Sequence, residues 1–200
     1  NVVDLVAIEM HGSGIRRQCL TGGPSLGPKD GMTANPDDLF GYLEKLGIAH
    51  TTHWHEPVFT VEEGRDLKAS MPGGHTKNLF LTDKDGAIIL IAAEAHSKLK
   101  LNRLHRLIGT RRLSFGSPDL MEEVLGVTPG SVTAFALMND REGRVRFLVD
   151  AALMEHDIVN FHPLTNTGTT AIARKDLEVF AKATGHGFEM VDFTQLLDQA

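Results

Sequence analysis

Apolar side chains recur at helical spacing in four segments after residue 35. Asn35 and Pro36 form an N-cap with proline at the first helical position, and apolar residues then repeat up to Leu46. Ser117 and Pro118 mark a second start of this kind, and a glycine follows each expected helix end. The pattern predicts helices over residues 36–46, 99–108, 118–125 and 177–184.

Shorter apolar runs predict β-strands. The runs at 78–82 and 87–93 flank Asp83-Lys84-Asp85-Gly86, a strong turn sequence, and predict a hairpin. Further strands are expected over residues 58–61, 169–173 and 188–193, with a second hairpin formed by 132–138 and 145–149. Because hairpins join strands directly, we expect a mixed α/β (α+β) fold with a mixed, largely antiparallel sheet surrounded by helices, not a doubly wound parallel sheet.

Residues 1–31 differ from the rest of the chain. They contain six glycines and two prolines, and no apolar period continues beyond Ile8. We expect a disordered leader or a non-native extension, with Met32 as a plausible start, although residues 2–8 are apolar enough for an added strand. Residues 32–200 are then expected to form a single domain. The leader lacks the basic, apolar and small-residue pattern of a signal peptide.

Charge and cysteine content narrow the function classes. The formal net charge of −6 argues against a generally basic nucleic-acid-binding surface. One segment, residues 98–112, is locally basic and fits either an RNA contact or a solvated helix face. Cys19 is the single cysteine, which excludes an internal disulfide and favours the cytoplasm. The longest apolar run, 87–93, is far shorter than the roughly 18 residues of a membrane span.

The first candidate site lies where a glycine loop meets a strand. Pro72-Gly73-Gly74 leads into Lys77 and Asn78. Glycines let backbone approach a ligand closely, and a lysine beside them can hold a phosphate or stabilise a polarised ester. The alternatives are a surface lysine and a strand-start cap. Strand geometry turns Lys77 and Asn78 to opposite faces, so both serve one ligand only if the strand begins irregularly.

A second polar cluster follows at residues 161–166. Pro163 restricts the backbone of His162 and helps to aim its imidazole, which can act as a hydrogen-bond donor, acid or base. Asn166 and Thr170 are placed to orient this ring, unless His162 is only structural. The glycines of residues 126–131, Gly130 above all, can expose backbone N–H groups to an oxyanion; the alternative is an ordinary helix-to-strand turn.

A metal site is the main alternative chemistry. His50, His53 and His55 have the spacing of metal ligands, but no neighbouring carboxylate or cysteine completes a set. The chain has neither a Gly-x-Ser-x-Gly elbow nor a phosphate-binding P-loop. We therefore expect no metal and no cofactor.

Three motifs taken together resemble the YbaK/ProX superfamily, free-standing relatives of the editing insertion domain of bacterial prolyl-tRNA synthetase. They are Pro-Gly-Gly-His-Thr-Lys-Asn-Leu-Phe-Leu (72–81), Gly-Val-Thr-Pro-Gly-Ser-Val-Thr (126–133) and Val-Asn-Phe-His-Pro-Leu-Thr-Asn (159–166). The resemblance covers about residues 33–193 and looks closest to the ProX branch, also called PrdX or ProXp-ala. Ala134 departs from the proline that many members have four residues after the glycine, which argues against the cysteine-editing YbaK branch.

The resemblance implies a compact fold around a curved sheet and a metal-free hydrolysis of mischarged tRNA. The substrate it implies is alanyl-tRNA(Pro), with the tRNA acceptor end and prolyl-tRNA synthetase as partners. Lys77, Asn78, His162 and Gly130 match active-site positions of the family. From their nearness to these motifs, we expect the substrate to contact Val58, Phe59, Leu67, Met71, Ser131, Asn166 and Thr170. Editing of serine or cysteine, or binding of aminoacyl-tRNA without catalysis, are the alternatives.

Overall fold

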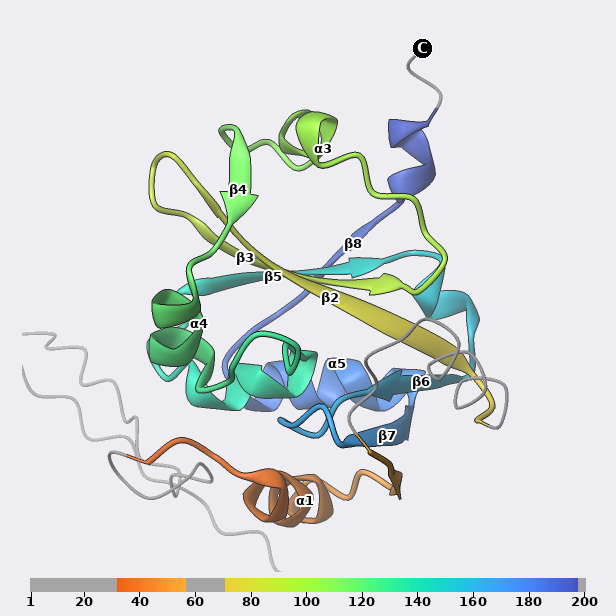
Figure 1. The fold of residues 1–200 in the computed structure, drawn as a ribbon. Coiled ribbons are helices and arrows are strands. Elements are labelled where there is room, and N and C mark those ends of the chain that lie inside the picture. The colour runs from red at the N-terminus through yellow and green to blue at the C-terminus, as the bar shows by residue number, and fades with distance from the viewer. Residues whose placement is uncertain (1–31, 57–70, 198–200) are drawn as a thin grey trace, which may run out of the picture.

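A computed structural model describes residues 32–56 and 71–197 of the chain (Figure 1). Within these residues it has four α-helices, eight β-strands and three short 3₁₀-helices. The leader expected at residues 1–31 and the strand expected at 58–61 lie outside the described residues, so both stay predictions. No helix in the described part has the length and apolar composition that crossing a bilayer requires.

The elements follow one another along the chain with short connections. The α-helices are α1 (Pro36–Lys45), α3 (Leu101–Leu107), α4 (Pro118–Leu125) and α5 (Arg174–Ala183). The strands are β1 (His50–Trp54), β2 (Gly74–Asp83), β3 (Ile88–Glu94), β4 (Leu113–Phe115), β5 (Val145–Asp150), β6 (Ile158–Phe161), β7 (Gly168–Ala173) and β8 (Glu189–Val191). The 3₁₀-helices are η1 (Ala134–Asn139), η2 (Leu153–Glu155) and η3 (Phe193–Leu196).

All eight strands belong to one mixed sheet. Its path runs in the order β1-β7-β6-β2-β3-β5-β8, and β4 pairs with β2 beside this path. Among the described strands, four pairings are antiparallel and three are parallel. The predicted mixed α/β fold, with helices around a single mixed sheet, is confirmed.

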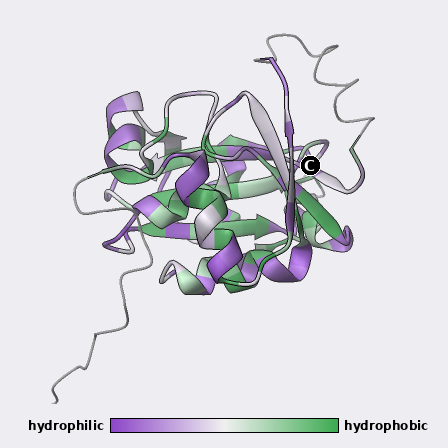
Figure 2. Cartoon of the chain, turned by 90° about the horizontal axis from the view of Figure 1, so that it is seen from below, coloured by the Kyte–Doolittle hydropathy of each residue, from purple (hydrophilic) through white to green (hydrophobic). Residues whose placement is uncertain are grey.

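The sheet separates two hydrophobic layers. The larger layer packs α1, α4, η1 and α5 against one face, which includes Phe80 and Leu90. The smaller layer packs α3 and η3 against the other face, which includes Leu81 and Ile89. Figure 1 shows the helices on both sides of the sheet, and Figure 2 shows apolar strands between helices with hydrophilic outer surfaces. Neighbouring residues of β2 therefore face different layers.

Helix starts agree with the capping residues in the sequence. The Asn35 Oδ1 atom accepts a hydrogen bond from the Asp38 backbone N–H at 3.1 Å, and the Asp38 carboxylate completes a capping box. Ser117 caps α4 in the same way, and Gly126 ends that helix in the left-handed conformation at φ 63°. Helix α5 begins at Arg174, three residues before the predicted start at Leu177. The prediction missed the first turn because that turn is polar and carries no apolar period.

One of the two predicted hairpins is correct. β2 and β3 pair antiparallel, with Leu81 opposite Ile89. The second hairpin is wrong, because residues 134–139 form η1 and β5 pairs in parallel with β3. Residues 134–138 are buried, so their apolar run carries no alternation that separates a strand from a buried helix. Thr133 favours the helix, since its Oγ1 accepts from the Phe135 backbone N–H at 3.3 Å.

Three strands have no clear signal in the sequence. β1 is a largely polar edge strand, β4 has three residues, and β6 is a short run that leads directly into the polar cluster. The last predicted strand is only partly correct, because β8 covers Glu189–Val191 and the chain then turns into η3. The missed strands β1 and β6 matter most, since they frame the predicted site.

Strand β2 has an unpaired stretch on one side. β3 lines one side of β2 from Thr76 to Thr82. On the other side, β6 pairs only with Gly74 and His75, and β4 pairs only with residues 81–83. Within the described residues, the stretch between these two partners, residues 76–80, therefore has no strand beside it. Lys77 and Asn78 lie in this unpaired stretch.

Candidate active site

Lys77 lies in the unpaired stretch of β2 and faces the smaller hydrophobic layer. Its Nζ donates hydrogen bonds to the backbone carbonyls of Ala95, at 3.0 Å, and Ser97. Both carbonyls belong to the turn that follows β3. The ammonium group is therefore held by backbone dipoles at the point where β6 stops and β2 continues.

Asn78 points to the opposite face of β2. Its Nδ2 donates to the Thr76 Oγ1 atom at 3.2 Å, two residues back on the same face. Its Oδ1 is buried, and no partner is found for it among the described residues. β2 is regular from Gly74 onward, so the irregular strand start that would let Asn78 join Lys77 does not occur. A shared ligand for these two side chains stays a prediction.

Asn160, which is not among the predicted site residues, ties the first motif to the third. Its buried Nδ2 donates to the carbonyls of Pro72 at 3.0 Å and Gly74 at 3.3 Å. The Thr76 hydroxyl donates to the Asn160 carbonyl at 2.7 Å. An amide inside the otherwise apolar Val159-Asn160-Phe161 run was the available signal. Asn160 fixes the position of β6 against the start of β2.

Gly73 and Gly74, at the start of β2, lie in close contact with residues 156–158. A Cβ at Gly73, which has φ 98°, would lie 2.5 Å from the Ile158 carbonyl oxygen. A Cβ at Gly74 would lie 2.6 Å from the ring of His156. Real Cβ atoms do not approach other atoms so closely, so only glycine lets β2 begin against β6. At Gly73, the close approach that glycine permits is to the Ile158 backbone of the same chain.

His162 lies immediately after β6 and is half-buried. Its Nδ1 lies 2.9 Å from the Gly168 carbonyl oxygen. A carbonyl can only accept, so Nδ1 carries the hydrogen in this contact, and Nε2 of the neutral ring is the nitrogen that can take a proton. Pro163 restricts the backbone of His162, and the Gly168 carbonyl sets the orientation of its ring.

The β2–β6 register ends two residues before both Lys77 and His162. His75 pairs with Asn160 in parallel, and this is the last pair that joins the two strands. Phe161 pairs with Thr170 of β7, and the neighbouring residue of β7, Thr169, pairs with His53 of β1. Lys77 and His162 therefore each follow, by two residues, a pair at which β2 and β6 lie side by side.

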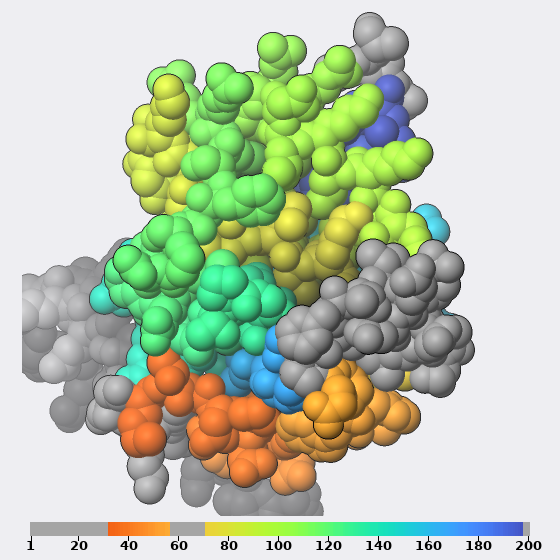
Figure 3. All heavy atoms as spheres, viewed as in Figure 1, coloured from red at the N-terminus to blue at the C-terminus, as the bar shows by residue number. Residues whose placement is uncertain are grey.

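The Gly130 loop adjoins the same region. Gly130 is exposed with φ 93°, and a Cβ there would lie 3.8 Å from the Asn166 Nδ2 atom. The second and third motifs are therefore neighbours. Leu164, in the same β6–β7 connection as Asn166, has φ 63°, a conformation that is strained for leucine and marks a constrained loop. Figure 3 shows the blue β6–β7 connection between the teal segment before η1 and the orange β1.

The predicted substrate-contacting residues divide into three groups. Asn166 lies beside Gly130, as the prediction requires. Ser131, Thr170 and Met71 are buried, and the Thr170 Oγ1 atom bonds to that of Thr52 at 2.8 Å rather than to His162. Val58, Phe59 and Leu67 lie outside the described residues, so their part in the pocket stays a prediction.

The three histidines of the alternative metal site do not converge. His50 stacks on Phe40 with ring centroids 5.3 Å apart, and strand alternation turns His53 to the other face. The His55 Nε2 atom lies 3.1 Å from the Thr169 Oγ1 atom. Within residues 32–56 and 71–197, no group of three or more His, Cys, Asp or Glu side chains is placed to hold a metal ion.

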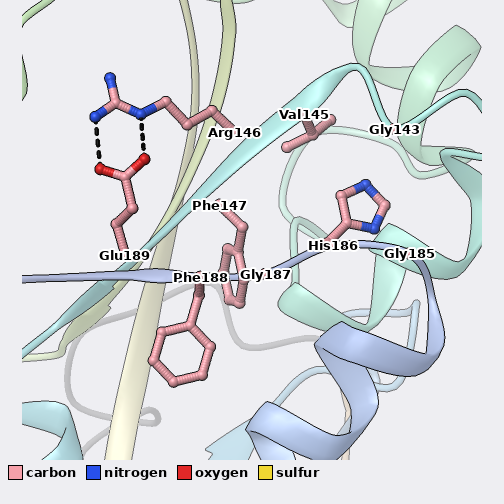
Figure 4. Close-up of a pocket in the computed structure, with 9 residues that line it drawn as sticks. All are labelled: Gly143, Val145, Arg146, Phe147, Gly185, His186, Gly187, Phe188 and Glu189. Carbon is pink, nitrogen blue, oxygen red and sulfur yellow. Dashed lines mark hydrogen bonds and ion pairs between the residues drawn. The ribbon is translucent and has the colours of Figure 1, made fainter.

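A separate hollow of about 320 Å³ lies at the β5–β8 edge, and no predicted site residue lines it (Figure 4). In it, Arg146 and Glu189 form a bidentate pair, with both N–O distances at 2.7 Å. The buried His186 beside it has both ring nitrogens occupied, by Thr184 and by Asp140 at 3.0 Å. This region joins β8 and the end of α5 to the sheet and has no reactive group left over.

The basic segment begins next to the lysine. Residues 98–112 follow Ser97, whose carbonyl accepts from Lys77 Nζ. Five of its six cationic side chains belong to exposed residues: Lys98, Lys100, Arg106, Arg111 and Arg112. Figure 3 shows this yellow-green segment directly above the yellow β2 on the face that carries the three motifs. A polyanion on this surface would reach the Lys77 region.

Comparisons with known proteins place the chain in a family. A family model described as "Aminoacyl-tRNA editing domain" matches residues 55–180. The chain is 34% identical over 151 residues to the prolyl-tRNA editing protein ProX of Acetoanaerobium sticklandii, covering 75% of this chain and 92% of that protein. It is 36% identical over 156 residues to prolyl-tRNA synthetase associated domain-containing protein 1 of Mus musculus, covering 76% of this chain and 92% of that protein.

Solved structures are similar in fold. One crystal structure, described as a candidate trans-editing enzyme for prolyl-tRNA synthetase, matches with a TM-score of 0.61 over 86% of this chain and 98% of its own. The sequence identity is 19%, so this likeness is evidence for the fold alone.

Proposed function

Since the chain belongs to the aminoacyl-tRNA editing domain family, we propose that it is a trans-editing hydrolase that removes alanine from mischarged tRNA(Pro). The observation that carries the proposal is the meeting of three motifs at the unpaired stretch of β2. The β2–β6 register ends two residues before both Lys77 and His162, and Gly130 lies beside Asn166 in the loop that follows His162.

The reaction is hydrolysis of the ester that joins the amino acid to the terminal ribose. Water, helped by the neighbouring ribose hydroxyl, attacks the ester carbon and forms a tetrahedral oxyanion. The C–O bond to the ribose then breaks, and the ribose oxygen takes up a proton. With water as the nucleophile, the products are the free amino acid and uncharged tRNA. No described side chain is an obvious covalent nucleophile.

Each motif has one task in this mechanism. Backbone N–H groups around Gly130, which is exposed and has no side chain in the way, stabilise the oxyanion. The Lys77 ammonium neutralises the terminal phosphate or the polarised substrate carbonyl. His162, with its Nδ1 bonded to the Gly168 carbonyl, presents Nε2 to the ribose. No metal or cofactor takes part in the proposed reaction.

The surroundings fit a tRNA substrate. The basic segment, residues 98–112, lies next to Lys77 and gives an overall acidic protein one surface for the phosphates of the acceptor end. Prolyl-tRNA synthetase, which produces the mischarged tRNA, is the proposed partner, and the cytoplasm is the proposed location.

The decisive experiment compares charged tRNAs. We expect rapid deacylation of alanyl-tRNA(Pro), slower deacylation of alanyl-tRNA(Ala) and none of prolyl-tRNA(Pro), measured by release of radiolabelled amino acid. Faster release from seryl- or cysteinyl-tRNA(Pro) would reassign the amino acid while keeping the reaction. Tight, salt-sensitive tRNA binding without turnover of any charged tRNA would contradict the hydrolase and favour a binding module.

A further inference from the structure

Trp54 is an exposed aromatic side chain at the end of edge strand β1. It is 57% exposed, while most large apolar residues of the described part are buried. Scattered exposed apolar residues are common, but an indole held rigidly beside a polar site is a feature of ligand-binding surfaces. The surroundings of Trp54 determine whether its ring is held in this way.

The indole of Trp54 is held by Phe40 and Gly168. Phe40 of α1 meets it edge-on, with ring centroids 6.2 Å apart and planes at 82°. Phe40 is itself stacked on His50. Gly168 lies against the indole so closely that a Cβ there would be 3.0 Å from the Trp54 Cε3 atom. The ring therefore has a set orientation while more than half of the residue stays accessible to solvent.

Trp54 and His162 are linked through Gly168 and Pro163. Gly168, against which the indole lies, is the residue whose carbonyl accepts the His162 Nδ1 hydrogen. Pro163, the residue after His162, is also in contact range of Gly168, since the same Cβ would lie 3.0 Å from the Pro163 Cγ atom. Figure 3 shows β1, in lighter orange, next to the blue β6–β7 connection.

We propose that the exposed face of Trp54 is a stacking platform for the 3′-terminal base of the RNA whose ester reaches His162. This rests on the proposed function, because the ester is carried by the ribose of that same terminal nucleoside. The terminal base is joined to the ribose that carries the ester. It can therefore reach Trp54, which packs on Gly168, the hydrogen-bond partner of His162. Stacking on an aromatic ring is the usual way that proteins hold unpaired bases.

The stacking contact acts on binding. A base that stacks equally in the ground state and the transition state lowers KM and leaves kcat unchanged. Base–aromatic stacking has a typical strength equivalent to roughly a tenfold change in affinity. Trp54→Ala should therefore raise KM for the charged tRNA about tenfold with kcat nearly unchanged, and Trp54→Phe should recover most of the loss.

Trp54 is the only tryptophan of the chain, so its fluorescence reports this site alone. The first test titrates the wild-type protein with an uncharged RNA hairpin that ends in CCA, and with the same hairpin ending in CC. We expect saturable quenching by the first and much weaker quenching by the second. Equal quenching by both RNAs would overturn the proposal. This measurement needs neither turnover nor a variant that folds.

The second test uses matched variants in the deacylation assay. Met190→Ala is the control, because Met190 is 65% exposed on β8 at the far end of the sheet and should leave KM unchanged. An unchanged KM in Trp54→Ala would overturn the platform and leave the proposed hydrolase standing. Terminal-base-dependent quenching without turnover of any charged tRNA would refute the hydrolase and leave the platform standing. A fluorescence shift that depends on protein concentration without RNA would assign the surface to a second copy of the chain and overturn the proposal.

Discussion

Lys77 takes hydrogen-bond partners from residues 18 and 20 positions further along the chain. Its place after a glycine loop made it a candidate from the sequence. Its bonds to the carbonyls of Ala95 and Ser97 depend on the turn after β3, which pattern reasoning left undefined. Asn160 was missed for a related reason: its importance lies in contacts to residues far away in the sequence, Pro72 and Gly74.

We expect Lys77→Ala to lower deacylation of alanyl-tRNA(Pro) by at least about 10²–10³-fold, the usual effect of removing one group that stabilises the transition-state charge. Single-turnover rates with saturating enzyme measure this loss. Lys84→Ala is the matched control, because Lys84 lies exposed in the turn of the same hairpin and should keep the wild-type rate. Wild-type activity in Lys77→Ala would rule out the proposed role of the lysine.

At the scale of elements, the sequence predicted best where local signals decide the structure. The caps at Asn35 and Ser117 and the turn at residues 83–86 act over a few residues, and the helices and hairpin there are confirmed. β6 and η1 depend on tertiary burial. β6 is short, and η1 is apolar on every side, so neither carries a readable period. β6 frames the predicted site, so the geometry of that site could not be predicted from the sequence.

The start of β2 gives a test at this scale. Gly73→Ala should destabilise the protein, because its Cβ would meet the Ile158 backbone and displace β6. Gly86→Ala is the control: Gly86 has a similar φ of 87° but nothing within 4 Å of the added Cβ. We expect both variants to lose about 1–2 kcal/mol from the left-handed backbone, and Gly73→Ala about 1–3 kcal/mol more from the clash.

Urea unfolding monitored by circular dichroism measures both losses. Equal losses in the two variants would mean that β6 does not pack against Gly73 as described. A larger loss of unfolding free energy in Gly73→Ala, together with a lower deacylation rate than in Gly86→Ala, would mean that the proposed activity depends on the β2–β6 contact.

For the whole molecule, the mixed sheet order could not be read from the sequence. Hairpin signals predicted antiparallel neighbours, but β2, β3 and β5 also take parallel partners from distant parts of the chain. β8 joins the sheet edge in this way, and the Arg146–Glu189 pair bridges β5 and β8. The Arg146 hydrogen bond holds the pKa of Glu189 below its ordinary value of 4.5.

The lowered pKa of Glu189 predicts a small acid-dependent loss of stability. The ion pair stabilises the folded protein above the ordinary carboxyl pKa, and this contribution is lost as pH falls through the folded-state pKa. Both side chains are partly exposed, so we expect less than about 1 kcal/mol. Urea unfolding near pH 7 and pH 3 should show a smaller pH difference in Glu189→Gln than in the control Glu155→Gln. An identical pH difference in the two variants would contradict the prediction.

The parallel contact between β2 and β6 also sets when the site can come into being. The Asn160 side chain and the Gly74 carbonyl that it binds are 86 positions apart in the sequence. During synthesis, β2 and β3 leave the ribosome well before β6. Until β6 is made, the side of β2 that pairs with it has no partner strand. Contacts of such long sequence separation form late in folding and leave strand edges open to wrong pairing meanwhile. The contact between β2 and β6 can therefore form only after β6 has been synthesised, and until then the flank of β2 stays open to wrong pairing.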